Sequence, residues 1–289
     1  MPETAATPED LSQWDLVITP DRGWFDLRLP EIWKHRELIY VFFKRDFVSS
    51  YKQTILGPFW FFAQPLMTTL VYWGVFGRIG KIVTPHVPQF IFFMAGIILW
   101  NFFSTSLTKT ATVFTGNSGL FGKVYFPRLT VPLSVVLNSL AIFGVQLVMF
   151  LGFFLVVWWF GVPVHPNWRL IILPALLIEM AALAIGVGCL VAAATVKYRD
   201  FAMIIQFGVQ LWMFASCVVF PLHTFEPRLQ HWVVLNPMVP IIESFRYAFI
   251  GFGVITIQQL LVSMVMTGVI FIVGLVLFAR VERTHLDSI

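Results

Sequence analysis

The sequence predicts an all-α integral membrane protein with six transmembrane helices, an amphipathic interface helix before them and a re-entrant helix pair between spans five and six. Composition is the first observation: 58% of the 289 residues are hydrophobic and 12% are charged, whereas soluble domains carry about 25% charged residues. Length is the second, because a membrane helix needs about 20 apolar residues. Six runs meet that length: 58–77, 89–113, 130–160, 169–194, 201–220 and 257–279.

Residues 1–30 are expected to form a cytoplasmic segment, since they are acidic and lack the apolar core of a signal peptide. Residues 31–56 then form the interface helix and the entry to span one. At 100° per residue most of their apolar side chains share one arc, although His35, Arg36 and Asp46 interrupt it. A basic amphipathic helix of this kind lies in the membrane interface. The arc contains Ile32, Trp33, Leu38, Ile39, Tyr40, Phe42, Phe43 and Phe47.

The six-span transmembrane domain is placed at 57–280. Pro58, after Gly57, suits the first turn of span one. Span three is longer than a bilayer requires, so it must tilt, bend near Pro132 or project beyond the membrane.

The lysines and arginines predict the orientation of the chain. With a cytoplasmic N-terminus, thirteen fall in inner segments: Arg22, Arg28, Lys34, Arg36, Lys44, Arg45, Lys52, Lys123, Arg128, Lys197, Arg199, Arg280 and Arg283. Five fall in outer segments: Arg78, Lys81, Arg169, Arg228 and Arg246. Lys109 lies near an inner end. This excess satisfies the positive-inside rule, so both termini, including the tail at 281–289, are predicted to be cytoplasmic.

The segment between spans five and six is mixed in character. Neither half of residues 221–250 is apolar or long enough to cross, yet each half has helical spacing and Asn236-Pro237 forms a natural turn between them. A re-entrant helix pair fits this pattern if protein covers its backbone. An ordinary extracellular loop is the alternative.

The stretch TGNSGLFGKV at 115–124 superficially resembles a phosphate-binding loop. A Walker loop reads G-x-x-x-x-G-K-[ST], but here Asn117 replaces the first glycine and Val124 replaces the hydroxyl residue. The stretch is therefore not a nucleotide site. His223, Glu226 and His231 match no strong metal-binding spacing, and no catalytic arrangement stands out. We expect no catalytic site, metal or cofactor in this chain, and no nucleic-acid partner.

Polar residues inside the spans carry more information, because each is costly in a bilayer. They include Gln64, Asn101, Asn138, Gln146, Glu179, Gln206 and Gln210. Glu179 either lines a polar path or is a buried carboxyl, neutral or paired with another helix. Gln206 and Gln210 are four residues apart and share one helix face, which we expect to face the interior. Tyr72, Trp73 and Phe76 either stack against sugar rings or face lipid.

Short motifs along residues 17–280 resemble the permease subunits of ABC-type polysaccharide exporters, which move O-antigen, capsule or teichoic-acid chains. The matching stretches are WKHRELIY (33–40), KRD (44–46), YKQTILGP (51–58) with Gln64-Pro65, GNSGL (116–120) with KVYFPR (123–128), KYRD (197–200), and LNP (235–237) with Glu243 and Phe245-Arg246.

The resemblance implies a homodimer in the inner membrane, two separate ATPase subunits that bind ATP and magnesium, and a lipid-linked polysaccharide as substrate. It implies that the ATPases act on the interface helix and the loop between spans two and three. The coupling candidates are Arg36, Lys44, Arg45, Asn117, Gly119, Leu120, Lys123, Arg128 and Arg199. It also implies a path lined by spans one and five, with candidates Gln64, Tyr72, Trp73, Phe76, Gln206, Gln210 and Phe214.

Three other functions stay open at this point. The first is an ABC exporter of another lipid or a drug, and the second is a secondary transporter that uses Glu179 as a proton or ion relay. The third is a membrane-embedded glycosyl- or acyltransferase, which would need clustered acids and histidines. Glu179 is the only acidic residue within a predicted span, and that argues against the transferase.

Overall fold

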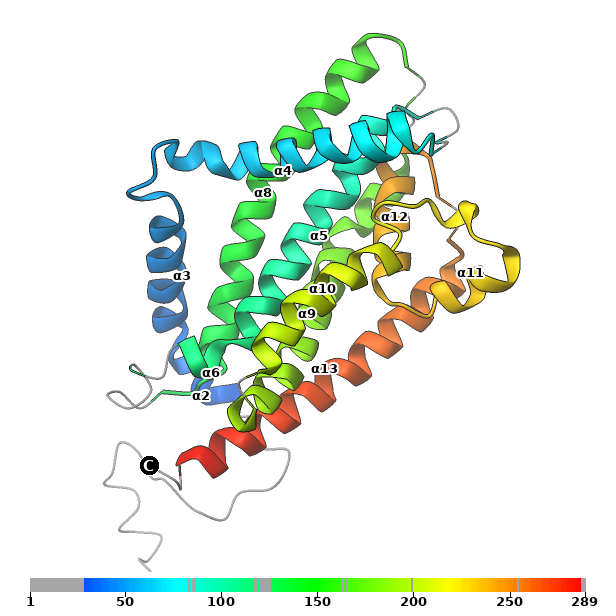
Figure 1. The fold of residues 1–289 in the computed structure, drawn as a ribbon. Helices are drawn as coiled ribbons and strands as arrows, with labels where there is room; N and C mark the ends of the chain where they lie inside the picture. The colour runs from blue at the N-terminus through cyan, green and yellow to red at the C-terminus, as the bar shows by residue number, and fades with distance from the viewer. Residues whose placement is uncertain are drawn as a thin grey trace, which may run out of the picture.

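The computed structural model describes residues 29–82, 84, 87–116, 119, 126–162, 164, 166–198, 200–253 and 255–286. All regular structure in this part of the chain is helical (Figure 1), which confirms the predicted class. Four helices are long and apolar enough to cross a membrane, and they correspond to predicted spans two, three, four and six. They are α5 (Gln89–Ala111), α8 (Thr130–Trp159), α9 (Leu173–Lys197), preceded by η3 (Trp168–Ile172), and α13 (Ile257–Leu286).

Helix α5 is the centre of the hydrophobic core. It packs against α8, α9, α4 (Trp60–Tyr72), α10 (Phe201–Ala215) and α12 (Met238–Ile250). In its most apolar stretch of 18 residues, 78% of the residues are buried. Its aromatic residues Phe92, Phe93 and Phe103 are fully buried. Apolar contact on every side explains why this helix is hydrophobic all round.

Helices α9 and α13 approach closely because small residues face each other where they cross. A Cβ atom on Gly186 would lie 2.7 Å from Cα of Phe271, and one on Gly274 would contact the backbone oxygen of Gly186. Gly188 has a similar role against α5, since its Cβ would lie 2.6 Å from Cβ of Thr110. Small residues at helix crossings are the usual way in which membrane helices pack.

Helix α8 has 30 residues and is therefore about 45 Å long at 1.5 Å per residue. Its C-terminal turns extend past the neighbouring helices in Figure 1, and Trp158 and Trp159 there are exposed. Pro132 lies in the first turn of the helix, where proline breaks no hydrogen bond. The extra length is thus taken up by projection beyond the bundle, without a bend at Pro132.

Predicted span one, residues 58–77, is divided into three helical pieces. A short turn η1 (Gly57–Phe59) leads into α4 (Trp60–Tyr72), and the π-helical η2 (Trp73–Ile79) continues it. The sequence of η2 is WGVFGRI, and its two glycines allow the helix to widen. The α-helical part alone, with 13 residues, is shorter than a bilayer requires.

Predicted span five, residues 201–220, is too long by five residues. Helix α10 (Phe201–Ala215) ends where Cys217 adopts a positive φ of 56°. Asn236 stabilises this end, because its Nδ2 donates to the oxygen of Ala215 at 3.1 Å and to Oγ of Ser216 at 2.9 Å. Fifteen residues span only about 22 Å, so the six-span count is not confirmed.

The segment after α10 forms η4 (Leu222–Thr224) and then two helices, as expected from its pattern. Helices α11 (Pro227–Val233) and α12 (Met238–Ile250) meet at 105°, and the break between them contains Asn236-Pro237. The described residues thus contain four candidate spans, or five if this bent pair counts as one. Most of α12 is buried, which supplies the protein cover that its backbone needs.

The predicted interface helix is two helices, α2 (Leu29–Lys34) and α3 (Arg36–Tyr51), which meet at His35. Nδ1 of His35 lies 2.7 Å from the backbone oxygen of Glu31. Helix α3 packs against α8 and buries Phe42, whereas Trp33 is 74% exposed and Tyr40 60% exposed. The predicted apolar arc is thus divided between a packed face and an exposed face, so a single amphipathic face is not confirmed.

Candidate functional site

Three of the predicted path residues form one aromatic cluster. The Tyr72 and Phe76 rings, from α4 and η2, are 5.5 Å apart, and Phe76 lies 6.5 Å from Phe214 on α10. The Tyr72 hydroxyl is 3.7 Å from the sulfur of Met213, and Phe220 lies 5.9 Å from Phe76. These separations are typical of interacting rings. The cluster therefore joins the two helices that the sequence assigned to spans one and five.

Trp73 lies outside this cluster. Its ring packs 6.5 Å from Phe90 at the start of α5, and the Arg78 guanidinium lies 4.8 Å from it. A cation over an indole face is a favourable contact. Trp73 thus fastens η2 to α5.

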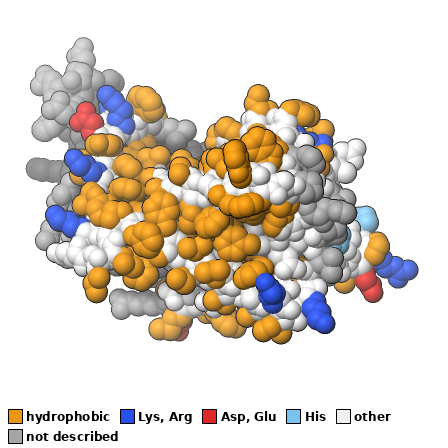
Figure 2. Space-filling model, turned by 90° about the horizontal axis from the view of Figure 1, so that it is seen from above, with side chains coloured by type: hydrophobic (Ala, Val, Ile, Leu, Met, Phe, Trp, Pro, Cys, Tyr) orange, Lys and Arg blue, Asp and Glu red, His pale blue; other side chains and the backbone are white. Residues whose placement is uncertain are grey.

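Gln206, Gln210 and Phe214 share the exposed face of α10. The same face carries large exposed hydrophobic side chains, among them Phe207 and Leu211. Helix α4 and η2 are also exposed along Met67, Leu70, Val71 and Val75. Seen from above, hydrophobic side chains cover most of the surface and charged side chains lie toward its margins (Figure 2).

Gln64 is separate from the aromatic cluster. It lines a cavity of about 300 Å³ between α4, α5 and α8, together with Asn101 and Gln146. Three of the polar residues that the sequence placed inside spans are therefore brought together in space.

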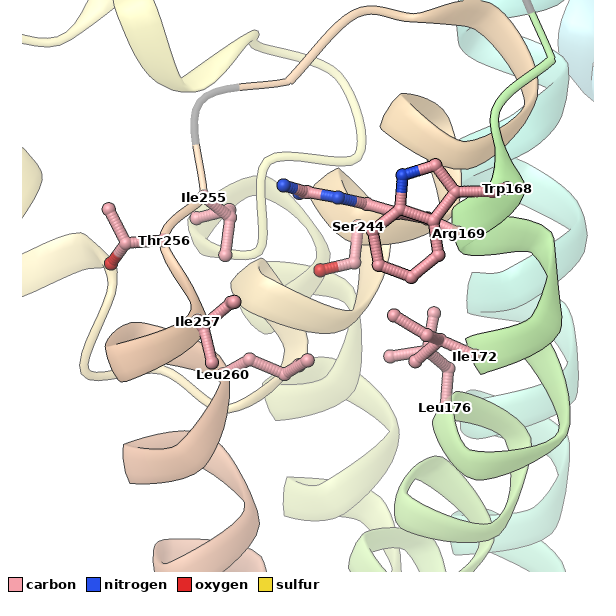
Figure 3. Close-up of a pocket in the computed structure, with 9 residues that line it drawn as sticks. All are labelled: Trp168, Arg169, Ile172, Leu176, Ser244, Ile255, Thr256, Ile257 and Leu260. Carbon is pink, nitrogen blue, oxygen red and sulfur yellow. The ribbon is translucent and has the colours of Figure 1, made fainter.

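A second cavity is much smaller and lies between η3, α12 and the start of α13 (Figure 3). Its volume is about 70 Å³, and Trp168, Arg169 and Ser244 are among its lining residues. The Arg169 guanidinium also lies 4.5 Å from the Tyr247 ring. At about 30 Å³ per water molecule, this space suits water and excludes a sugar ring.

Five of the nine predicted coupling residues are described, and they belong to α3, to position 119 and to the chain just before α8. Helices α2 and α6 (Val113–Gly116), the start of α8 and the end of α13 lie together at the lower end of Figure 1. Arg36, Lys44 and Arg45 are exposed on α3, and Nε of Arg45 donates to Asp46 at 2.8 Å. Gly119 is exposed and a Cβ atom there would meet open space. The remaining coupling candidates Asn117, Leu120, Lys123 and Arg199 lie outside the described residues.

Arg128 differs from the other coupling candidates because it is only 4% exposed. Its backbone nitrogen donates to the Glu282 carboxylate at 3.1 Å, and its guanidinium lies 5.7 Å from the Phe114 ring. Burial lowers the pKa of the Arg128 guanidinium, and the charge of Glu282 opposes that shift. Arg128 therefore holds the start of α8 against the end of α13 and offers little surface to a partner.

Of the two alternatives for Glu179, a residue lining a polar path or a buried carboxyl, the structure shows a buried carboxyl with a hydrogen bond to another helix. It is 5% exposed, and its Oε1 lies 2.5 Å from the Ser263 hydroxyl on α13. That hydroxyl also lies 3.0 Å from the backbone oxygen of Pro237. Glu179 thus connects α9 and α13 to the turn between α11 and α12.

The largest fully buried side chain is Arg246 on α12, which the charge count placed among the outer cations. Its guanidinium donates to the backbone oxygens of Cys217 at 2.6 Å and Val218 at 2.7 Å, and to Glu243 at 3.2 Å. Counting charges gave no sign of this burial. The signal was the pair itself, a glutamate and an arginine three residues apart within an apolar stretch.

A known protein family matches most of the chain. A family model described as "ABC-2 type transporter" matches residues 37–250, from α3 to the end of α12. Within the described residues, no group of three or more histidine, cysteine or acidic side chains could hold a metal ion.

Several relatives are similar along most of their length. The chain is 29% identical over 224 residues to the "O-antigen export system permease protein RfbA" of Myxococcus xanthus, which covers 76% of this chain and 82% of that protein. A Klebsiella pneumoniae protein with the same description is 22% identical over 246 residues, or 85% and 92% of the two chains. The "Polysialic acid transport protein KpsM" of Escherichia coli is 23% identical over 249 residues, or 85% and 94%.

Proposed function

The chain belongs to the ABC-2 type transporter family, and on that premise we propose that it is the membrane-spanning permease subunit of an ATP-driven polysaccharide exporter. The observation that carries this proposal is the similarity of the chain, over 76–85% of its length, to proteins described as O-antigen export permeases and a polysialic acid transport protein. The substrate is a lipid-linked polysaccharide of the O-antigen or capsule kind, and the membrane is the inner membrane. ATP and magnesium bind to a separate ATPase subunit.

We further propose six spans with both termini in the cytoplasm. Helix α4 and η2 together cover residues 60–79, a length of about 20 residues that suffices for a span. Helix α10 and the chain that follows it serve as span five, and α11 and α12 form the re-entrant pair. In support, α2, α6 and the end of α13, which carry predicted inner segments, lie at one end of the molecule (Figure 1).

The permease works as a homodimer in this proposal. The faces of α4 and α10 that carry the path candidates are exposed in one chain, and they include Met67, Phe207 and Leu211 beside Gln206 and Gln210. Large exposed apolar surfaces mark lipid or protein contacts. A second copy would enclose the glutamines and the Tyr72–Phe76–Phe214 cluster, so that sugar rings pass between aromatic faces and amide groups.

Two ATPase subunits act on the basic ends of the permease dimer. Arg36, Lys44 and Arg45 project from α3, and Gly119 belongs to the loop between spans two and three. Helix α3 contacts α8, so a push on the interface helix reaches the bundle directly.

Reconstitution into liposomes tests this function. Inside-out vesicles containing the permease, its partner ATPase and a lipid-linked polysaccharide should translocate the polysaccharide only when ATP is added. A partner that binds but does not hydrolyse ATP is the matched control. Translocation by the permease alone, without ATP, would contradict the proposal.

A further inference from the structure

The cavity of about 300 Å³ between α4, α5 and α8 is distinct from the aromatic cluster. Gln64 at the cavity precedes Tyr72 of the cluster by eight residues on one helix, a distance of about 12 Å along its axis. The cavity reaches from the end of α3, at Ser50, to the middle of α5 and α8. It is therefore a separate space on the side of α4 that faces α8.

The lining of this cavity combines uncharged polar groups with aromatic rings. Amides come from Gln64 on α4, Asn101 on α5 and Gln146 on α8. Trp60 contributes an indole ring, and none of the described residues that line the cavity carries a charge. Amides donate and accept at the same site, which matches the hydroxyl groups of a neutral ligand. An anionic ligand would find no counter-charge here.

Two polar side chains in the cavity wall are almost completely buried. Gln146 is 5% exposed and lines the cavity with its amide. Ser139 is 2% exposed, and its Oγ is covered by protein, so it offers a ligand no accessible hydroxyl. Burying a polar group without a partner costs free energy, and buried polar groups are usually satisfied. A ligand in the cavity would therefore bind to the amides of Gln64, Asn101 and Gln146.

We propose that this cavity is a binding site for one or two neutral sugar rings of the transported polysaccharide, an inference that rests on the proposed function. A volume of about 300 Å³ is at the lower limit of small-molecule sites. The apolar face of a pyranose ring suits Trp60, while its hydroxyls match the amides of Gln64, Asn101 and Gln146. The site would hold part of the glycan beside the conduit.

Saturation-transfer NMR on the full chain in phosphatidylcholine nanodiscs tests the site. The probes are methyl mannoside and methyl galactoside, with methyl glucuronide as the anionic comparison. The neutral glycosides should receive saturation from the protein, and the glucuronide should receive less. Gln146→Leu and Asn101→Leu, which remove amides from two different helices, should each weaken neutral binding about fivefold, the loss of roughly one hydrogen bond.

Gln258→Leu on α13 is the matched control, since Gln258 is exposed and lies outside the cavity lining, and it should bind as the wild type does. Absence of transfer in the wild type, equal transfer to the glucuronide, or binding that survives both cavity variants would overturn the site. Suppression of the signal by phosphatidylglycerol in the nanodisc would instead assign the cavity to a lipid headgroup and overturn its assignment to the polysaccharide. Glycoside binding without ATP-driven export would count against the proposed function and leave the site in place.

Discussion

Replacing Arg246 with methionine should destabilise the permease more than any single exposed substitution. The guanidinium is fully buried and lies 3.6 Å from the centre of the Phe92 ring. It donates to the oxygens of Cys217, Val218 and Phe92 and to the Glu243 carboxylate. Gly96 makes room for it, since a Cβ atom there would lie 2.6 Å from Nη2 of Arg246. Arg246 thus connects α12 to α5 and to the segment that follows α10.

The magnitude follows from two separate losses. Three hydrogen bonds to backbone oxygens are worth about 2 kcal/mol together, at the average of about 0.6 kcal/mol measured in membrane proteins. Glu243 is 1% exposed, and stranding a buried charge by removing its partner costs about 3–5 kcal/mol. The carboxylate therefore dominates the expected loss. The double variant Arg246→Met/Glu243→Gln removes the stranded charge and should lose only about 2 kcal/mol.

Reversible unfolding in mixed detergent micelles measures both variants. Arg228→Met is the matched control, because Arg228 is exposed on α11, and it should change the free energy of unfolding by less than about 0.5 kcal/mol. A double variant no more stable than Arg246→Met would refute the reasoning, because it would show that the stranded carboxylate is not the cost. A loss of less than about 1 kcal/mol in the single variant would refute it equally.

Three further predictions concern packing, Glu179 and coupling. Gly274→Val should lower the melting temperature in detergent, because its Cβ would contact the oxygen of Gly186. Gly268→Val should not, because nothing lies within 4 Å of the Cβ position there. Equal melting temperatures of the two variants would contradict the packing role. Glu179→Gln keeps a polar partner for Ser263 and should export at the wild-type rate in the ATP-driven assay; loss of export that persists with a functional ATPase would favour a relay role. The Gly119→Trp variant should fold normally, since nothing lies within 4 Å of the Cβ position of Gly119. Its complex with the ATPase should nevertheless hydrolyse more ATP for each polysaccharide exported. An unchanged ratio would argue against this loop as the contact with the ATPase.

The long apolar helices could be predicted well from the sequence. Spans two, three and six begin in the structure at the predicted residues, Gln89, Thr130 and Ile257. These limits are local properties, because an apolar run of sufficient length forms a helix whatever surrounds it. The length of span five was overestimated for the opposite reason. The end of α10 depends on Asn236, which lies far along the chain.

Within the candidate site, the sequence predicted helix identity better than side-chain direction. Tyr72, Phe76 and Phe214 meet as the assignment of spans one and five would suggest. Trp73 turns toward α5 instead, because adjacent residues of a helix point about 100° apart, whereas Tyr72 and Phe76 are four residues apart and share a face. Tyr72, Trp73 and Phe76 were predicted as one set without regard to that difference.

Polar residues within the apolar segments gain their meaning only from their neighbours. In the sequence, Glu179 was one of the costly polar groups within spans and Arg246 was one of the outer cations, whereas Gln146 looked the same as Glu179. The first is paired with Ser263 and the second with Glu243 and backbone oxygens, so both serve the packing of α12 against the bundle. Gln146 instead lines the cavity between α4, α5 and α8 together with two other amides. A polar group inside a bilayer needs either an internal partner or a ligand. Glu179 and Arg246 have internal partners and stabilise the fold, whereas Gln146 is available for the sugar binding that we propose.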